Sequence, residues 1–161
     1  MPELPDVVIY LERIEALIGG TELERIRISS PWVLRTYDPQ PDAFDGKRVT
    51  GLRSMGKRIV LECECDLFVV IHLMVAGRLR LRDRGAKGGR NALAVFDLSD
   101  TSLVLTEASK RKRASIWVVR GEDQLRADHD RGGVEPLDVD AAGFAAALRS
   151  RNRTLKRALT D

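Results

Sequence analysis

Cysteines, histidines and aromatic side chains are scarce in this sequence of 161 residues. Its two cysteines, Cys63 and Cys65, are too few for a disulfide framework or a zinc site, so we expect two half-buried thiols on one strand face. No apolar run approaches the roughly 18 residues that a membrane helix needs, and no basic segment leads into an apolar stretch at the N-terminus. These absences predict a cytoplasmic protein without membrane contact.

Positive charge is concentrated in the middle of the chain. Residues 1–45 hold four basic and nine acidic side chains, residues 46–90 hold eleven and four, and residues 91–161 hold twelve and eleven. Basic residues crowd into segments 77–90, 110–113 and 149–157. Each run alone is also typical of a solvated surface, but three runs separated by apolar strands favour a polyanionic partner.

The apolar pattern predicts one N-terminal helix followed by strands. Apolar residues recur at three- and four-residue steps over residues 5–18, and Gly19-Gly20 ends that pattern. A period of two then marks strands at 23–28, 48–55, 58–64, 67–74, 78–82, 93–98, 102–106 and 115–120. Their short connections predict antiparallel hairpins. We therefore expect an α+β fold, mostly β: a two-layer antiparallel β-sandwich with a long N-terminal helix.

A second, all-α domain is predicted to begin near the C-terminus. Residues 1–133 form the expected sandwich domain, and residues 134–161 the start of the second domain. The segment 138–149 is Ala-rich and helical, and 154–160 reads as the opening of another helix whose apolar pattern is unfinished at Asp161. The pattern predicts a piece of a longer protein.

The N-terminal residues Met1-Pro2-Glu3 carry the clearest chemistry. Removal of Met1, which a small second residue permits, leaves the secondary amine of Pro2 as the terminus. An α-amino group has a pKa of roughly 7.7 to 8, so part of it is an unprotonated nucleophile at neutral pH. Attack on an aldehyde-level carbon gives an iminium ion, and the neighbouring Glu3 can transfer protons. The alternative is that Pro2 and Glu3 only lead into the helix.

Several motifs together resemble the formamidopyrimidine-DNA glycosylase and endonuclease VIII family. They occur in the family's order across nearly the whole chain: residues 1–6, Gly56-Lys57-Arg58, Ile71-His72-Leu73, Gly77-Arg78-Leu79 and Thr154-Leu155-Lys156. The resemblance implies base-excision repair: a monomeric DNA glycosylase with AP lyase activity that acts on double-stranded DNA containing oxidised bases or abasic sites. It also implies a helix-two-turn-helix domain that residues 134–161 only begin, so this chain by itself is expected to bind DNA weakly and to be weakly active or inactive. No cofactor is expected within this chain, whereas the resemblance implies one zinc in a later C-terminal finger.

The resemblance also assigns roles to individual residues. Pro2 matches the Schiff-base nucleophile, Glu3 the general acid, and Lys57 the lysine that reaches the target phosphate and assists β/δ-elimination. A solvated hairpin lysine is the alternative for Lys57, and His72 is expected to be a core histidine. The DNA-binding residues implied are Met74, Val75, Asn91, Lys112, Arg113, Arg151, Arg153 and Lys156.

Two segments depart from the family pattern. Val75 stands where the 8-oxoguanine enzymes have Met, with Met74 beside it. In the basic loop, Lys112 takes the place of the arginine that reads the base opposite the lesion, and Ala114 that of a wedging phenylalanine. Because lysine offers no planar bidentate fork, we expect an altered or relaxed opposite-base preference.

Two other functions fit the same residues. One is a non-catalytic module of the same fold that binds damaged DNA without cutting it. The other is a sandwich with an unrelated partner, in which the motifs are coincidental. Covalent trapping on an abasic duplex separates the first alternative from the enzyme, and the salt dependence of DNA binding tests the second.

Overall fold

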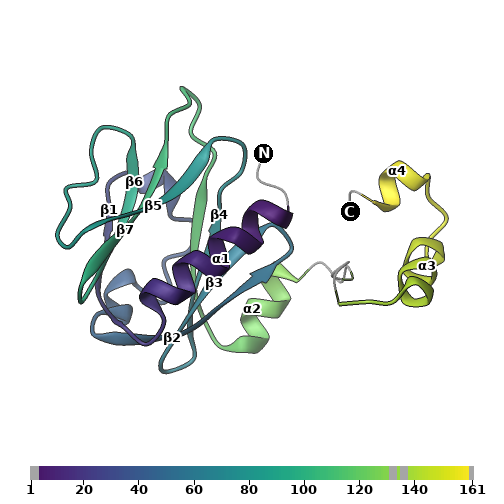
Figure 1. Ribbon diagram of the computed structural model, residues 1–161, viewed down its shortest axis with the longest axis horizontal. Coiled ribbons are helices and arrows are strands. Elements are labelled where there is room, and N and C mark those ends of the chain that lie inside the picture. Colours follow the sequence, from purple (N-terminus) through teal and green to yellow (C-terminus); the bar gives the residue numbers. More distant parts are fainter. Residues whose placement is uncertain (1–3, 131–133, 135–137, 160–161) are drawn as a thin grey trace.

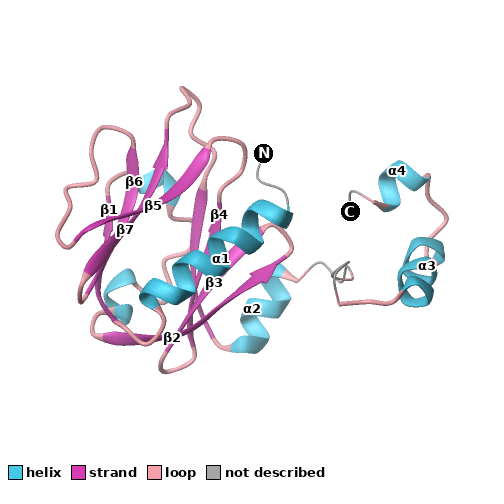
Figure 2. Ribbon diagram, in the orientation of Figure 1, coloured by secondary structure: helices cyan, strands magenta, loops and turns pink. Residues whose placement is uncertain are grey.

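The computed structural model describes residues 4–130, 134 and 138–159 (Figures 1 and 2). Eight strands, the long helix α1 and the short helix α2 form the main body, and two further short helices follow it along the chain. The helices are α1 (Leu4–Ile18), α2 (Glu122–His129), α3 (Ala141–Arg149) and α4 (Leu155–Ala158). The strands are β1 (Glu22–Ile28), β2 (Lys47–Met55), β3 (Arg58–Cys63), β4 (Leu67–His72), β5 (Gly77–Asp83), β6 (Ala92–Leu98), β7 (Thr101–Glu107) and β8 (Ser115–Arg120).

All strand pairs are antiparallel, in the order β5-β7-β6-β1-β2-β3-β4-β8. The β1–β2 pairing is short, with only Glu22–Arg48 and Leu23–Lys47 in register. This corner divides the strands into a β5-β7-β6-β1 layer and a β2-β3-β4-β8 layer. The expected two-layer antiparallel sandwich is therefore confirmed.

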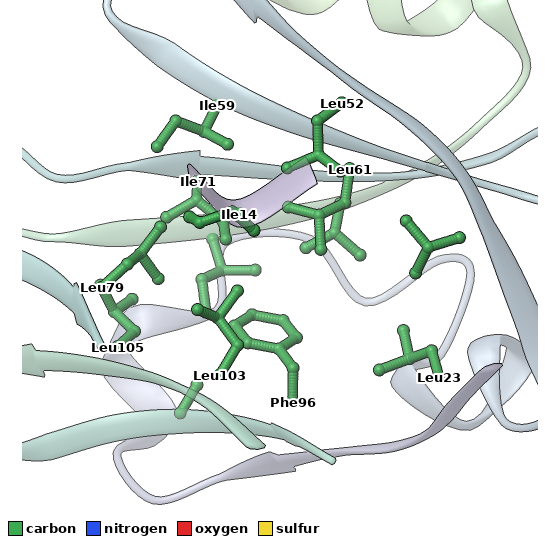
Figure 3. Close-up of a cluster of buried hydrophobic side chains, with 14 of the residues drawn as sticks. Ile14, Leu23, Leu52, Ile59, Leu61, Ile71, Leu79, Phe96, Leu103 and Leu105 are labelled. Carbon is green, nitrogen blue, oxygen red and sulfur yellow. The ribbon is translucent and has the colours of Figure 1, made fainter. Parts of the chain in front are cut away.

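The main core lies between the two layers and α1 (Figure 3). Phe96, Leu103 and Leu105 come from one layer, and Ile59, Leu61 and Ile71 from the other. The helix α1 contacts β2 and β3 and adds the fully or almost fully buried side chains of Val7, Ile14 and Ile18. The spacing of these residues is the apolar period that predicted the helix.

The helix α2 was not expected from the sequence. Within its eight residues only Leu125 and His129 are buried, too few for a detectable apolar period. Leu125 packs with Val60, Phe68, Val70 and Val119 against the outer face of the β2-β3-β4-β8 layer. Burial, and then the charge of Arg58, lower the pKa of His129, whose ring meets the ring of Trp117 edge-on at 5.1 Å. This layer is thus covered on both faces.

The two cysteines differ from our expectation. Cys63 is buried on β3, where burial raises the pKa of its thiol to about 12. Cys65 is exposed in the following turn, with φ of 64°, so the two side chains do not share a strand face. The strand ends before Cys65 because the chain turns there to form the β3–β4 hairpin.

A buried carboxylate stabilises the β1–β6–β7 region. Asp97 is 2% exposed and accepts hydrogen bonds from Arg25 Nε at 3.0 Å, Arg27 Nε at 2.6 Å and Ser102 Oγ at 3.0 Å. Burial raises the pKa of Asp97, but the hydrogen bonds from Arg27, Arg25 and Ser102 outweigh it and bring the pKa to about 2. The ionised form therefore stabilises the fold.

We expect Asp97→Asn to lower the free energy of unfolding at pH 7 by about 2 kcal/mol. Because the folded-state pKa is about 2 and the ordinary value is 3.8, this contribution is complete above pH 3.8 and disappears as the pH falls towards 2. Urea unfolding of both proteins at pH 7 and pH 3 measures the difference. Asp100→Asn, at an exposed neighbouring position, is the control. Equal stability of wild type and Asp97→Asn at pH 7 contradicts the role of the ion pairs.

Candidate active site

The strand register brings several connections to one end of the sandwich. Across the β2-β3-β4-β8 layer, Met55 pairs with Arg58, Arg58 with His72, and His72 with Ser115. The β2–β3 turn, the β4–β5 turn and the loop before β8 therefore lie at the same end. In the other layer Gly77 pairs with Glu107, and Glu107 N–H donates to the Asn91 carbonyl at 3.0 Å. This end, here called the loop end, collects Lys57, Met74, Val75, Asn91, Lys112 and Arg113.

Lys57 is exposed at the tip of the β2–β3 turn. Gly56 precedes it with φ of 58°, a left-handed conformation that glycine adopts without strain. On the other side, Arg58 fixes the base of the turn. Its guanidinium carbon lies 5.8 Å from the Trp117 ring centroid, and its Nη1 donates to the His129 carbonyl at 3.3 Å. Lys57 thus projects from a well-supported turn.

The β4–β5 turn presents Val75 rather than Met74. Val75 is 50% exposed, whereas Met74 is half-buried with φ of 54°. Gly77 N–H closes the turn by donating to the Leu73 carbonyl at 2.9 Å. A Cβ at Gly77 would lie 2.3 Å from that same carbonyl oxygen, so only glycine fits this turn. The exposed apolar side chain at the tip of this turn is therefore the branched Val75, not the flexible Met74.

Buried Glu107 organises the basic loop before β8. It is 1% exposed, and its carboxylate accepts hydrogen bonds from Ser109 Oγ at 3.1 Å, Arg113 N at 2.8 Å and Ala114 N at 3.1 Å. Its backbone carbonyl accepts a further bond from Lys112 Nζ. One carboxylate therefore fixes a loop whose surface carries four exposed cationic residues, 110–113.

We expect Glu107→Ala to loosen this loop, because the backbone N–H groups of Arg113 and of buried Ala114 lose their acceptor. The expected cost is about 2 kcal/mol in the free energy of unfolding, with faster amide exchange confined to residues 109–114. Affinity for a DNA duplex should fall about tenfold as the cationic residues lose their fixed positions. Hydrogen exchange and DNA titration measure both effects. Glu64→Ala, which removes an exposed carboxylate, is the control; unchanged exchange in Glu107→Ala contradicts the role of Glu107.

Ala114 does not occupy an exposed position. It is only 3% exposed and belongs to the main core, so it cannot fill a gap in a DNA duplex. The basic loop residues 110–113 are all polar. An aromatic side chain at the loop end must therefore come from another segment.

Pro2 and Glu3 lie outside the described residues. They precede α1, and the direction of α1 along the layer indicates which end of the sandwich its first turn faces. At the other end of α1, Gly20 N–H donates to the Val49 carbonyl at 2.9 Å, and Val49 pairs with Cys63. This pairing lies at the end of the layer away from Lys57. Since α1 runs along β2 and β3 from there, its first turn points to the loop end, and Figure 1 shows it beside the C-terminal end of β2.

The structure does not bring the remaining predicted DNA-binding residues to the loop end. Arg151, Arg153 and Lys156 lie after α3 and on α4, which Figure 1 shows apart from the sandwich. Asp140 caps α3 by accepting from Gly143 N–H at 2.7 Å, so that helix begins later than the sequence pattern indicated. The 134–161 domain assignment stays a prediction.

Trp32 and Arg35 also lie at the loop end, although the sequence did not predict them there. Together with Lys112 and Ala114 they line a small pocket. The only local signal was a tryptophan after Pro31, within a segment that follows the first strand. Its position beside the basic loop depends on pairing with β8, about 80 residues later in the sequence.

The described residues do not fit a metal centre. Within residues 4–130, 134 and 138–159, no group of three or more His, Cys, Asp or Glu side chains could hold a metal ion. The same part of the chain has no helix of the length and apolarity needed to cross a membrane. What the loop end offers instead is exposed cationic and apolar side chains on fixed turns, an arrangement suited to a nucleic acid.

Comparisons with known proteins agree with this arrangement. Formamidopyrimidine-DNA glycosylase from Acidovorax ebreus is 32% identical over 166 residues, which cover 99% of this chain and 59% of that protein. The enzyme of the same name from Moorella thermoacetica is 29% identical, covering 100% and 60%. The chain thus spans about three fifths of the length of these relatives.

Solved structures share the fold. Lactococcus lactis Fpg in complex with DNA containing an abasic site matches with a TM-score of 0.81 and 21% identity, over 98% of this chain and 60% of that one. MutM in complex with DNA containing carbocyclic 8-oxo-G matches with a TM-score of 0.80 and 23% identity, over 98% and 61%. The sequence profile of the formamidopyrimidine-DNA glycosylase N-terminal domain matches residues 1–116. The chain therefore belongs to the formamidopyrimidine-DNA glycosylase family.

Proposed function

We propose that this chain is the catalytic part of a base-excision repair DNA glycosylase that also acts as an AP lyase. The observation that carries the proposal is the convergence of the Lys57 turn, the 110–113 loop and the N-terminal end of α1 at one end of the sandwich. Family membership and the names of the relatives support it. The site of action that follows is the bacterial cytosol or nucleoid.

The proposed reaction begins at the nitrogen of Pro2, once Met1 has been removed. Its lone pair forms a bond to C1′ of the damaged nucleotide, and the C1′–base bond breaks with its electrons leaving on the base, which takes up the proton released from the Pro2 nitrogen. Glu3 protonates the ring oxygen, so the sugar opens to an iminium ion. The Glu3 carboxylate then accepts a C2′ proton as the 3′ phosphate leaves, and a second elimination, with loss of the C4′ proton to water, expels the 5′ phosphate. Water finally hydrolyses the iminium and frees the Pro2 amine.

Lys57 is proposed to hold the phosphate of the target nucleotide. An exposed ammonium group on a fixed turn can place positive charge where the leaving phosphate gains negative charge. Removal of this charge should slow the eliminations more than it weakens binding. Electrostatic stabilisation of this kind acts on the transition state.

The proposed partner is double-stranded DNA that contains oxidised bases or abasic sites. In this proposal the loop end binds the extruded nucleotide. Val75, Met74 and Asn91 lie near the opened duplex, and Arg113 binds phosphates. Lys112 donates to the Glu107 carbonyl and lacks a planar fork, which favours a relaxed preference for the opposite base. Arg151, Arg153 and Lys156 are proposed to add phosphate contacts from the second domain.

A duplex nicking assay with the full-length, Met-trimmed protein tests the proposal. The probe is a labelled duplex with one 8-oxoguanine or one abasic site, placed opposite each of the four bases in turn. We expect base release and strand nicking, with rates that differ little among the opposite bases. Binding of these duplexes without any nicking would instead support the non-catalytic damage-binding module. Binding that does not weaken as salt rises would contradict both DNA-based functions.

A further inference from the structure

Trp32 is the most exposed large hydrophobic side chain among the described residues, at 81%. It lies on a short 3-10 helix, Pro31–Val33, between β1 and β2. An indole left in water gives up the favourable free energy that its burial would provide. A single exposed apolar residue is common on protein surfaces, so its meaning depends on its support and its surroundings.

The support beneath Trp32 is rigid. The next two residues, Val33 and Leu34, are 2% and 7% exposed and belong to the main core. The segment then pairs with β8: Arg35 N–H donates to the Ile116 carbonyl at 2.8 Å, and Thr36 Oγ1 donates to the Val118 carbonyl at 2.8 Å. The backbone that carries Trp32 is therefore anchored by the buried side chains of Val33 and Leu34 and by the pairing with β8. It holds the indole in solvent.

The surroundings of Trp32 are cationic. Arg35 is exposed, and its Nε donates to Ser115 Oγ at 3.3 Å, beside the end of the basic loop. Lys112 from that loop lines the same small pocket as Trp32 and Arg35. Since Ser115 pairs with His72, and His72 with Arg58, this pocket is at the same end of the layer as the Lys57 turn.

An exposed indole between cationic side chains has the chemistry of a base-stacking site. The flat ring can stack on the face of a nucleobase, while the cations attract the adjoining phosphates. In a duplex, a base has a face accessible for stacking only if it is unpaired or lies beside a gap. Extrusion of a nucleotide creates bases of both kinds. The buried Ala114 leaves the basic loop without an exposed apolar or aromatic side chain for this purpose.

We propose that Trp32, flanked by Arg35 and Lys112, stacks on a base whose face is exposed when the duplex opens at the lesion. This inference rests on the proposed function, because the duplex opens only if a nucleotide is extruded. It makes Trp32 a binding residue of the loop end, contributed by a segment far from the family motifs in the sequence.

Tryptophan fluorescence and DNA affinity test this inference. The probes are a duplex with a central tetrahydrofuran abasic analogue and the same duplex intact. The chain has two tryptophans, so the difference between wild type and Trp32→Phe reports Trp32, and Trp117→Phe provides an independent single-tryptophan signal. We expect the abasic duplex, and not the intact one, to quench Trp32 strongly. Trp32→Ala should bind the abasic duplex about tenfold more weakly and the intact duplex almost unchanged, with Trp32→Phe restoring most of the affinity.

Tyr37→Ala is the matched control. Tyr37 is an exposed aromatic residue on the same segment, beyond the pairing with Val118, and its removal should leave both affinities unchanged. Equal losses on both duplexes in Trp32→Ala, or an unquenched Trp32, overturn the inference. If wild type is trapped by borohydride but Trp32→Ala binds normally, the stacking role alone fails. Selective quenching without any trapping upholds the stacking site and rejects the lyase.

Discussion

Lys57→Ala is expected to slow strand nicking at an abasic site about 100-fold, while the affinity for the same duplex falls only a few-fold. The reason is that, in the proposed mechanism, the ammonium group faces one phosphate, whose negative charge grows as it leaves. Single-turnover nicking with enzyme in excess measures the chemical step, and a binding titration measures affinity. Because Lys57 is exposed at a turn, its removal should leave the fold intact.

Two further variants sharpen this test. Lys57→Arg keeps the charge and should recover much of the nicking rate. Lys87→Ala removes another exposed lysine, from the β5–β6 connection, and should nick at the wild-type rate. A loss of affinity that accounts for the entire loss of nicking would make Lys57 a simple phosphate contact. Equal nicking by Lys57→Ala and wild type would remove it from the site.

A single additional residue before Pro2 is expected to abolish covalent chemistry. In that form the Pro2 nitrogen belongs to an amide, so it has no basic lone pair and cannot form an iminium ion. We expect a loss of at least about 1,000-fold in borohydride trapping and in nicking, with DNA affinity within a few-fold of the trimmed protein. Two otherwise identical preparations, cleaved to begin at Pro2 or one residue earlier, make the comparison.

The trimmed form should also show a pH dependence of its own. An α-amino group with a pKa of roughly 7.7 to 8 loses its proton as the pH rises through that range, and only the unprotonated form attacks. The rate of borohydride trapping under single-turnover conditions should therefore rise between about pH 6.5 and 8. It should then level off, because the amine is fully unprotonated well above its pKa. Nicking by the extended form at the trimmed form's rate would exclude the Pro2 amine as nucleophile.

Most of the sandwich was predictable because its strands obey local rules. A period of two in apolar residues, with short links between strands, gave the eight strands to within one or two residues at each end. The helix α1 was equally clear from its apolar face. The helix α2 was not, because only Leu125 and His129 meet the layer beneath it. Such a helix is defined by its contacts rather than by its own sequence.

The site was predictable where it depends on family motifs and hairpins. Antiparallel pairing necessarily carries Lys57, Val75 and the basic loop to one end, so their convergence follows from the strand order. The roles of Glu107 and Ala114 could not be foreseen, because burial decides them. Trp32 lies at the loop end because its segment pairs with β8. No local pattern in the sequence predicts that long-range contact.

The proposed catalysis depends on a covalent bond between the Pro2 nitrogen and C1′ of the target nucleotide. The test incubates the full-length, Met-trimmed protein with an abasic-site duplex in the presence of borohydride, digests the product and locates the DNA adduct by mass spectrometry. We expect a reduced adduct on the N-terminal peptide, at the Pro2 amine. An adduct on a lysine side chain such as Lys57, or tight binding without any adduct, would contradict the account.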